Sequence, residues 1–353
     1  MGEKHERSEI LDLMKGIAML VTIYCHALQR AVGNKCVDYS IWRYVHLWHM
    51  PLFFIVSGYL AADSKKLNSI SFIKNKFIRL IIPWFIWRWI EWFFMRFDFS
   101  GLLPFNSYVP TTFRGNLLAF IKQPFRPMWF LFDLFIFFVL LWFINAISYG
   151  NNKKMNWLLI TISALTIYLY YALRVFGEKV GFGYNQIAFL YYDVQYWGFF
   201  VFGFLFNRFT QYLSVKKKIV INAAYWMSAS LYTVIFGNAL VLWNLFGNNN
   251  SRLNIIYSWS VGILCVGGII LLCRFIQIKC THLISNAITF VGKKSMEYYT
   301  LQFLFLNCGL RLQNYFARWT MNFVLCMLIC TSIIILIDRF IVLKPLKKIL
   351  WGA

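Results

Sequence analysis

Lys15 and His26 lie eleven residues apart within one apolar stretch, EILDLMKGIAMLVTIYCHALQ. An α-helix has about 3.6 residues per turn, so eleven steps return to nearly the same direction about 16 Å further along the axis. The two side chains therefore share a face, and Asp12, Thr22 and Arg30 fall within about 40° of it. Lipid would not tolerate this polar stripe, whereas a bundle interior or a water-filled cavity would. The stripe is a candidate functional site.

A second apolar stretch, HLWHMPLFFIVSGYLA, repeats this pattern. His46, His49, Phe53 and Ser57 are spaced by three, four and four residues, which places two imidazoles and a hydroxyl on one helix face. Each residue also has a structural explanation. A membrane histidine can be a hydrogen-bonded packing residue, and Ser57 with Gly58 is a typical small-residue contact between helices.

A third stretch opens with the basic residues Lys76 and Arg79, one helical turn apart. Such a pair can converge on a phosphate group, because arginine offers a planar fork of donors and lysine a mobile point charge. Basic residues at a helix end can equally determine membrane topology. Deeper in the same stretch, Arg88 and Glu91 are three residues apart and can form an ion pair.

The elements that position these residues are predicted to be membrane helices. The chain is 60% hydrophobic, 20% aromatic and 14% charged, which is more apolar surface than a soluble protein of 353 residues could bury. We expect an all-α integral membrane bundle of about ten helices, forming one transmembrane domain over residues 1–353. The predicted spans are 10–30, 42–62, 77–95, 128–147, 157–173, 188–207, 219–236, 255–273, 295–310 and 320–338.

The distribution of basic residues predicts the topology. Placing both termini in the cytoplasm puts most of the 35 Lys and Arg residues on the cytoplasmic side. These clusters face anionic lipid headgroups, which accounts for the net charge of +22 without nucleic acid as a partner. The first span lacks a small-residue cleavage pattern and is expected to remain as a signal anchor. The eight cysteines form no metal-ligand spacing, so no metal is expected.

Five segments in this order resemble the integral-membrane acyltransferase family 3, whose better-known members O-acetylate cell-envelope or secreted glycans. The similar segments are the Lys15 to His26 spacing, HMPLFFIVSGY at 49–59, KFIRLIIP at 76–83, MWFLFDLF at 128–135 and VGKKSMEYY at 291–299. The resemblance implies a multi-pass protein of the inner membrane that takes an acyl group from cytoplasmic acyl-CoA, most often acetyl-CoA. The group is delivered to a glycan or glycolipid hydroxyl near the outer side.

The resemblance also implies roles for individual residues. His26 matches the catalytic histidine and Lys15 its basic companion, and His49 and Ser57 match the motif of the second helix. Lys76 and Arg79 match the basic pair associated with the donor, and we place Trp129 with them. Many members carry a histidine where this chain has Gln302. An amide donates and accepts hydrogen bonds but does not titrate, which leaves Gln302 an orienting or oxyanion-stabilising role.

The chemistry of the donor is compatible with this arrangement. The coenzyme A phosphates must stay at the cytoplasmic rim near Lys15, Lys76 and Arg79, whereas the thin pantetheine arm can extend the about 16 Å to His26. A neutral His26 can then accept a proton from the attacking hydroxyl. The acids that could orient its ring are Glu91, Asp133 and Asp193, and the oxyanion donors could be Ser57, His49, Trp129 or Gln302.

Two alternatives remain open from the sequence. An acyl-histidine intermediate is chemically possible, although direct transfer requires no covalent relay when the two substrates enter from opposite faces. The chain could also be a transporter or flippase of an envelope precursor, because intramembrane charges occur in such proteins too. No internal repeat supports this second function.

Overall fold

The computed structural model describes residues 2–64, 67, 69–96, 112–115, 117, 128–180, 195–209, 251–306, 312–340 and 344–352. Within these ranges the regular structure is helical, and five helices are long and apolar enough to cross a membrane. They are Glu9–Val32, Ser40–Ala62, Trp129–Ile147, Trp259–Lys279 and Tyr315–Arg339. The expected all-α membrane class is thus confirmed for the described part of the chain.

The number of ten spans and the cytoplasmic position of both termini stay predictions. The expected span 219–236 lies outside the described residues, as do residues 188–194 of the sixth span and 307–310 of the ninth. The prediction of a single transmembrane domain is likewise untested.

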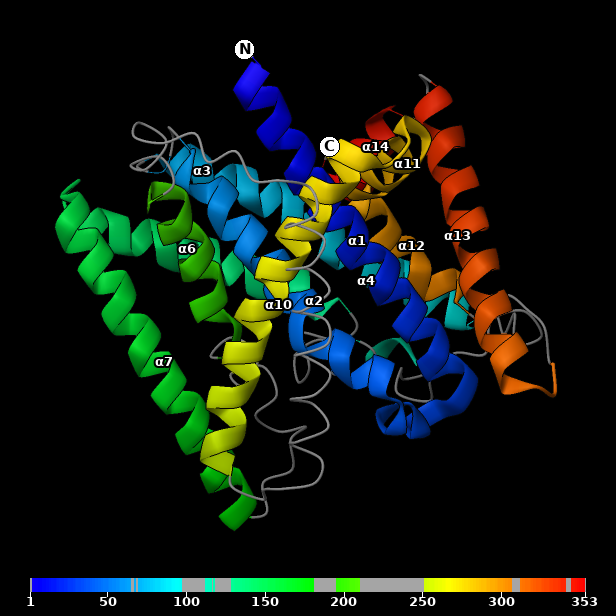
Figure 1. Cartoon of the computed structure of the whole chain (residues 1–353), viewed down its shortest axis with the longest axis horizontal. Helices are drawn as coiled ribbons and strands as arrows, with labels where there is room; N and C mark the ends of the chain where they lie inside the picture. Colours follow the sequence, from blue (N-terminus) through cyan, green and yellow to red (C-terminus); the bar gives the residue numbers. More distant parts are fainter. Residues whose placement is uncertain are drawn as a thin grey trace. The chain divides into compact units, whose positions relative to one another are not determined.

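Two compact units make up the chain. Unit 1 comprises Met1–Cys25, Asn34–Ser64 and Asn156–Ser295, and unit 2 comprises His26–Gly33, Lys65–Met155 and Met296–Ala353. Helix α1 (Gly2–Val32), blue in Figure 1, is continuous and contributes to both units. The interval from Lys15 to His26 is therefore a true helical spacing, as the sequence predicts.

Unit 1 is built around close contacts between helices. Helix α2 (Ser40–Ala62) packs against α10 (Ser251–Lys279), and α1 packs against α11 (His282–Lys293). A Cβ atom on Gly292 would lie 1.7 Å from the backbone oxygen of Asp12, and one on Gly16 would lie 2.1 Å from that of Ile288. Glycine is required at both positions because the two backbones touch. The glycine of the VGKK segment thus has a packing function.

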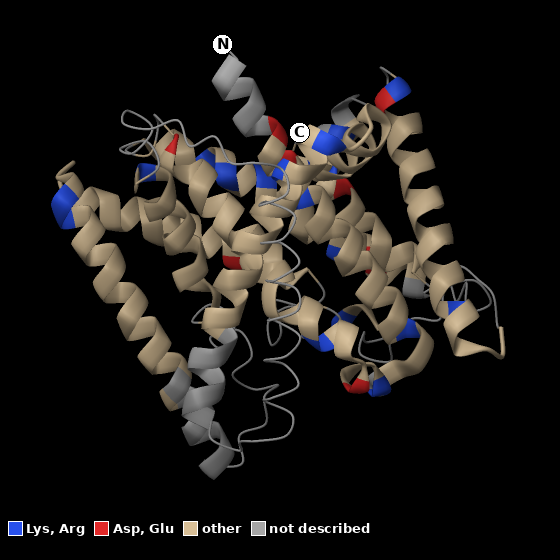
Figure 2. Ribbon diagram, viewed as in Figure 1, with Lys and Arg blue, Asp and Glu red and all other residues tan. Residues whose placement is uncertain are grey.

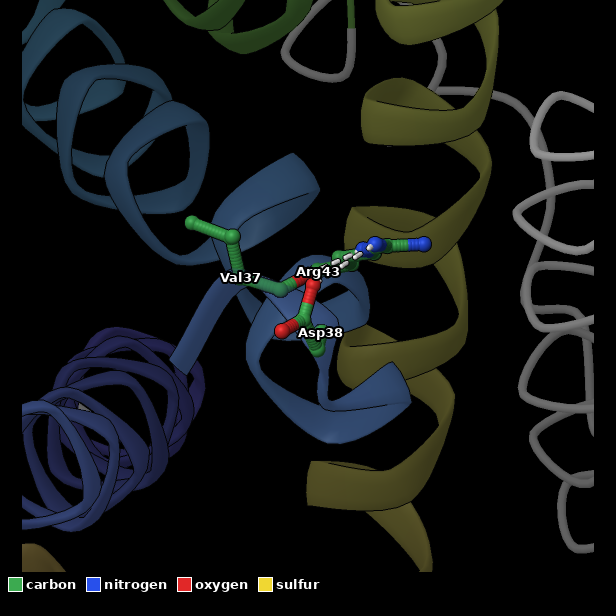
Figure 3. Close-up of polar contacts among 3 residues, drawn as sticks. All are labelled: Val37, Asp38 and Arg43. Atoms are coloured by element: carbon green, nitrogen blue, oxygen red, sulfur yellow. Dashed lines mark hydrogen bonds and ion pairs between the residues drawn. The ribbon is translucent and has the colours of Figure 1, made fainter. Parts of the chain in front are cut away.

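A short turn joins α1 to α2, and its residues after Gly33 belong to unit 1. The 3₁₀ helix η1 (Gly33–Asp38) begins at Gly33 with a φ of 65°, a left-handed conformation that glycine adopts without strain. Arg43, in the first turn of α2, folds back over η1 (Figure 3). Its Nε donates to the backbone oxygen of Val37, and its Nη2 lies 3.9 Å from the Asp38 carboxylate. These contacts fix the direction in which the chain re-enters the bundle.

Unit 2 holds α3 (Ile70–Lys76), the π-helical turn η2 (Phe77–Ile81), α4 (Ile82–Arg96), α6 (Trp129–Ile147), α12 (Ser295–Phe305), α13 (Tyr315–Arg339) and α14 (Lys344–Trp351). Helix α6 packs against α3 and η2, and α14 packs against α4 and α13. Figure 2 shows α13 free of charge except near its two ends, as expected for a helix that spans a membrane. Single-turn π segments often mark functional positions, and η2 carries Arg79.

Candidate active site

His26 lies near the end of α1 in unit 2 and is partly exposed. Its Nδ1 is 3.4 Å from the Gln29 Oε1, and its ring centroid is 6.0 Å from that of Phe303 on α12. An amide oxygen accepts but does not donate, so the tautomer that makes this contact carries its hydrogen on Nδ1. The Nε2 lone pair then remains available as a base.

A buried charge cluster lies one turn beyond His26. Glu91 of α4 is 6% exposed and lies within electrostatic reach of Arg30 on α1 and Arg88 on α4. The sequence predicts the pairing of Arg88 with Glu91, and the structure adds Arg30 from another helix. Since Arg30 follows His26 by one turn, the cluster ties the histidine-bearing end of α1 to α4.

The other two acids that could orient His26 have different positions. Asp133 of α6 is fully buried and lies within electrostatic reach of Tyr299 on α12. Asp193 lies outside the described residues. Glu91 is linked to α1 through its electrostatic interaction with Arg30.

Gln302 is fully buried on α12. Its Nε2 donates to the backbone oxygen of Tyr299 at 3.2 Å, and because that oxygen can only accept, the contact fixes the orientation of the amide. The Oε1 atom is buried and has no hydrogen-bond partner among the described residues. Gln302 therefore presents an acceptor, which a hydroxyl or amide N–H of a substrate could use.

An aromatic row connects Trp129, at the start of α6, to His26. The ring centroids are 6.4 Å apart between Trp129 and Phe130, and 5.9 Å apart between Phe130 and Tyr299. The row continues from Tyr299 to Phe303 at 5.6 Å and from Phe303 to His26 at 6.0 Å. Ring contacts of unit 2 thus connect α6, α12 and the end of α1 that carries His26.

Lys76 and Arg79, the two basic residues assigned to the donor, lie in unit 2 at the start of the chain's third predicted span, 77–95. The Arg79 side chain is exposed in η2, whereas Lys76 is partly buried with its Nζ 3.8 Å from the Phe138 ring centroid and 5.4 Å from that of Phe72. Lys76 precedes the predicted span 77–95. Burial, and secondarily the positive charge of Arg79, lowers the pKa of Lys76 to about 8.

Three predicted site residues belong to unit 1. The Lys15 Nζ pairs with the Asp12 carboxylate at 2.6 Å. His49 is buried, its Nδ1 donates to the Val45 oxygen at 2.8 Å, and its ring lies 4.8 Å from that of His46. Ser57 is partly buried one residue before Gly58. The catalytic and donor-binding roles of these three residues stay predictions.

Several residues of unit 2 were not singled out from the sequence. Tyr299 and Phe303 share a face of α12 because they are four residues apart, a spacing that was available as a signal. Phe130 is next to Trp129 in the sequence, and no spacing or motif marked it as a residue of the site. The electrostatic interaction between Arg30 and Glu91 links distant parts of the chain, so no local pattern could reveal it.

Comparison with known proteins identifies the chain's relatives. The acyltransferase family 3 model, described as an acyltransferase domain, matches residues 9–339. Nodulation protein NolL of Sinorhizobium fredii (strain NBRC 101917 / NGR234) is 25% identical over 169 residues, which are 47% of this chain and 43% of that protein. The NolL protein of Mesorhizobium japonicum (strain LMG 29417 / CECT 9101 / MAFF 303099) is 24% identical over 167 residues, which are 46% and 41% of the two chains.

The chain thus spans less than half the length of these curated relatives. No solved structure matches it. The family match extends over most of the 353 residues, and the helices that carry it are long and apolar enough to cross a membrane. This chain belongs to acyltransferase family 3.

Proposed function

We propose that this protein is an inner-membrane O-acyltransferase that uses cytoplasmic acetyl-CoA to modify a hydroxyl of a cell-envelope or secreted glycan. The observation that carries the proposal is the aromatic row ending at His26, whose Nε2 is available as a base. Membership of the acyltransferase family supports the same reaction class.

The donor is proposed to bind with its phosphates at the exposed Arg79 and at Lys76. Its pantetheine arm is proposed to extend from Lys76 towards His26 along the rings of α6 and α12, with Trp129 near its acyl end, because rings offer apolar walls to an uncharged chain. The arm also carries amide N–H groups, and the buried Oε1 of Gln302 is an acceptor that one of them could satisfy. Lys15 is proposed to contribute to donor binding from α1.

The proposed reaction is direct acyl transfer. The His26 Nε2 takes the proton of the glycan hydroxyl while the hydroxyl oxygen attacks the thioester carbonyl carbon. The tetrahedral intermediate then collapses, the carbon–sulfur bond breaks, and the imidazolium returns the proton to the departing thiolate. Glu91 is proposed to support this step through Arg30, by holding the end of α1 in place. Ser57 and His49 are proposed as donors to the oxyanion.

A transporter or flippase of an envelope glycan precursor is the alternative, and intramembrane charges such as Arg30 and Glu91 favour it. The two functions differ in their need for a donor. A transporter moves its cargo across a vesicle membrane without acyl-CoA and without covalent change. A transferase consumes acyl-CoA and leaves label on the glycan.

The test uses purified protein in vesicles, radiolabelled acetyl-CoA outside and an envelope glycan preparation inside. We expect wild-type protein to label the glycan and His26→Ala to lose the transfer while keeping its thermal stability. His282→Ala is the matched control, because His282 is an exposed histidine at the start of α11. Equal labelling by His26→Ala and wild type would refute the catalytic assignment, and glycan movement without donor would favour the transporter.

A further inference from the structure

Helix α14 is tied to three other helices of unit 2 by side-chain contacts. The Trp351 Nε1 donates to the Thr300 hydroxyl of α12 at 2.8 Å, and the Trp87 Nε1 of α4 donates to the Leu350 backbone oxygen at 2.9 Å. On the third side, the Lys347 Nζ pairs with the Asp338 carboxylate of α13 at 2.5 Å. The Trp351 ring is 4% exposed and lies 6.1 Å from the Trp87 ring. These contacts specify one position for α14.

The residue after α14 lies directly on the backbone of Arg79. Gly352 has a φ of 65°, and a Cβ atom placed on it would lie 2.5 Å from the Arg79 Cα and 3.1 Å from the Ile78 oxygen. No side chain fits there unless the Arg79 backbone or α14 moves. The Arg79 side chain, by contrast, is exposed. The end of α14 therefore supports the turn η2 from behind while the guanidinium points to solvent.

We propose that α14 is a positioning element of the donor site, which holds the Arg79 turn in register with α12 through Trp351. This inference rests on the proposed donor-binding role of Arg79. It concerns a segment beyond residue 339, where the match to the family model ends. Thr300 is next to Tyr299 of the aromatic row. The hydrogen bond from Trp351 to Thr300 therefore links α14, which supports Arg79 at the phosphate end of the proposed donor site, to α12, which carries the rings nearer its acyl end.

The proposal predicts a selective effect on the donor. A small displacement of the Arg79 side chain would weaken phosphate binding, because charged hydrogen bonds depend on short distances between donor and acceptor. The proton transfer at His26 would not change. Variants that disturb α14 should therefore raise the KM for acyl-CoA and the Kd for coenzyme A with little change in kcat. General destabilisation would instead lower the active fraction, and with it kcat, at unchanged KM.

The first variant is Gly352→Ala, compared with Gly150→Ala. Gly150 also has a positive φ, 74°, but a Cβ there would meet nothing within 4 Å. Both substitutions thus introduce backbone strain, and only the first one pushes on Arg79. We expect Gly352→Ala to raise the coenzyme A Kd at least about tenfold, towards the value of Arg79→Ala, and Gly150→Ala to leave it at the wild-type value.

The second variant is Trp351→Phe, which keeps an aromatic ring but cannot donate to Thr300. One net hydrogen bond corresponds to a rise in KM of about two- to tenfold. Thr300→Val should have an effect of similar size, and the double variant should be no worse than either single one if the bond is the cause. Trp157→Phe is the control, because Trp157 is 71% exposed on α7 (Asn152–Val180).

The outcomes separate this inference from the proposed function. If Arg79→Ala leaves the coenzyme A Kd unchanged, the donor site itself is wrong and the role of α14 falls with it. If Arg79→Ala weakens binding while Gly352→Ala and Trp351→Phe match their controls, the donor site stands and the positioning role is refuted. If Gly352→Ala does not fold, the KM values for acyl-CoA of Trp351→Phe, Thr300→Val and the double variant test the positioning role, and wild-type values in all three refute it.

Discussion

Donor binding should depend on pH through Lys76. Burial, and secondarily the charge of Arg79, lowers the pKa of Lys76 to about 8, so the ammonium is about 90% charged at pH 7 and about 10% charged at pH 9. If the charged form binds the donor phosphates, affinity falls as pH rises through the pKa. The expected increase in the Kd of coenzyme A from pH 7 to pH 9 is about tenfold.

The phosphates of the donor do not titrate in this range, because the second pKa of a phosphate monoester is near 6. The free thiol of coenzyme A begins to ionise towards pH 9, so the comparison with Lys76→Arg is what assigns the decline to the protein. The assay is isothermal titration of coenzyme A into purified protein in detergent at several pH values and constant ionic strength.

The Lys76→Arg variant sharpens this test. A guanidinium remains charged at pH 9, so the variant should bind coenzyme A with nearly constant affinity across the range. Lys74→Arg is the matched control, because Lys74 is an exposed residue of the same helix and its replacement should preserve the wild-type decline. A flat wild-type profile, or the same decline in Lys76→Arg, would refute the role assigned to Lys76.

Three further predictions concern the stability of the fold, measured by thermal or denaturant unfolding in detergent. Gly292→Ala should lower the free energy of unfolding by about 2 kcal/mol or more through overpacking, whereas Gly267→Ala, with open space around it, should not; equal effects would refute the backbone contact. Glu91→Gln should cost about 3 kcal/mol, because it leaves buried arginine charge uncompensated, and a neutral result would remove the cluster from the account. Asn207→Leu should cost about 1 kcal/mol by removing the bond to the Tyr59 backbone oxygen at 2.6 Å, and unchanged stability would show that bond to be dispensable.

The sequence predicted features that depend on short spacings. The helical relation of Lys15 to His26 and the membrane character of the chain follow from periodicity and composition, and both are confirmed in the described residues. Gly58 was predicted to permit close approach, and a Cβ there would lie 1.9 Å from the Phe200 backbone oxygen. The resemblance to acyltransferase family 3 is confirmed by the match over residues 9–339.

Tertiary relations were beyond the sequence. The electrostatic interaction of Arg30 with Glu91 links α1 to α4, and nothing local to either residue signals it. The amide orientation of Gln302 follows from a neighbouring carbonyl, which a residue type alone does not indicate. Trp351 could be recognised as apolar in a basic segment, but its contact with Thr300 arises only when α14 folds back onto unit 2.

The proposed activity is direct acyl transfer to a glycan hydroxyl with His26 as the general base. Its most direct test is mass spectrometry of envelope and secreted glycans from cells that lack the protein and are complemented with wild type, His26→Ala or His282→Ala. The account predicts an acyl mass increment with wild type and with His282→Ala, and none with His26→Ala expressed at the same level. Glycans of equal mass in all strains, or full modification by His26→Ala, would contradict it.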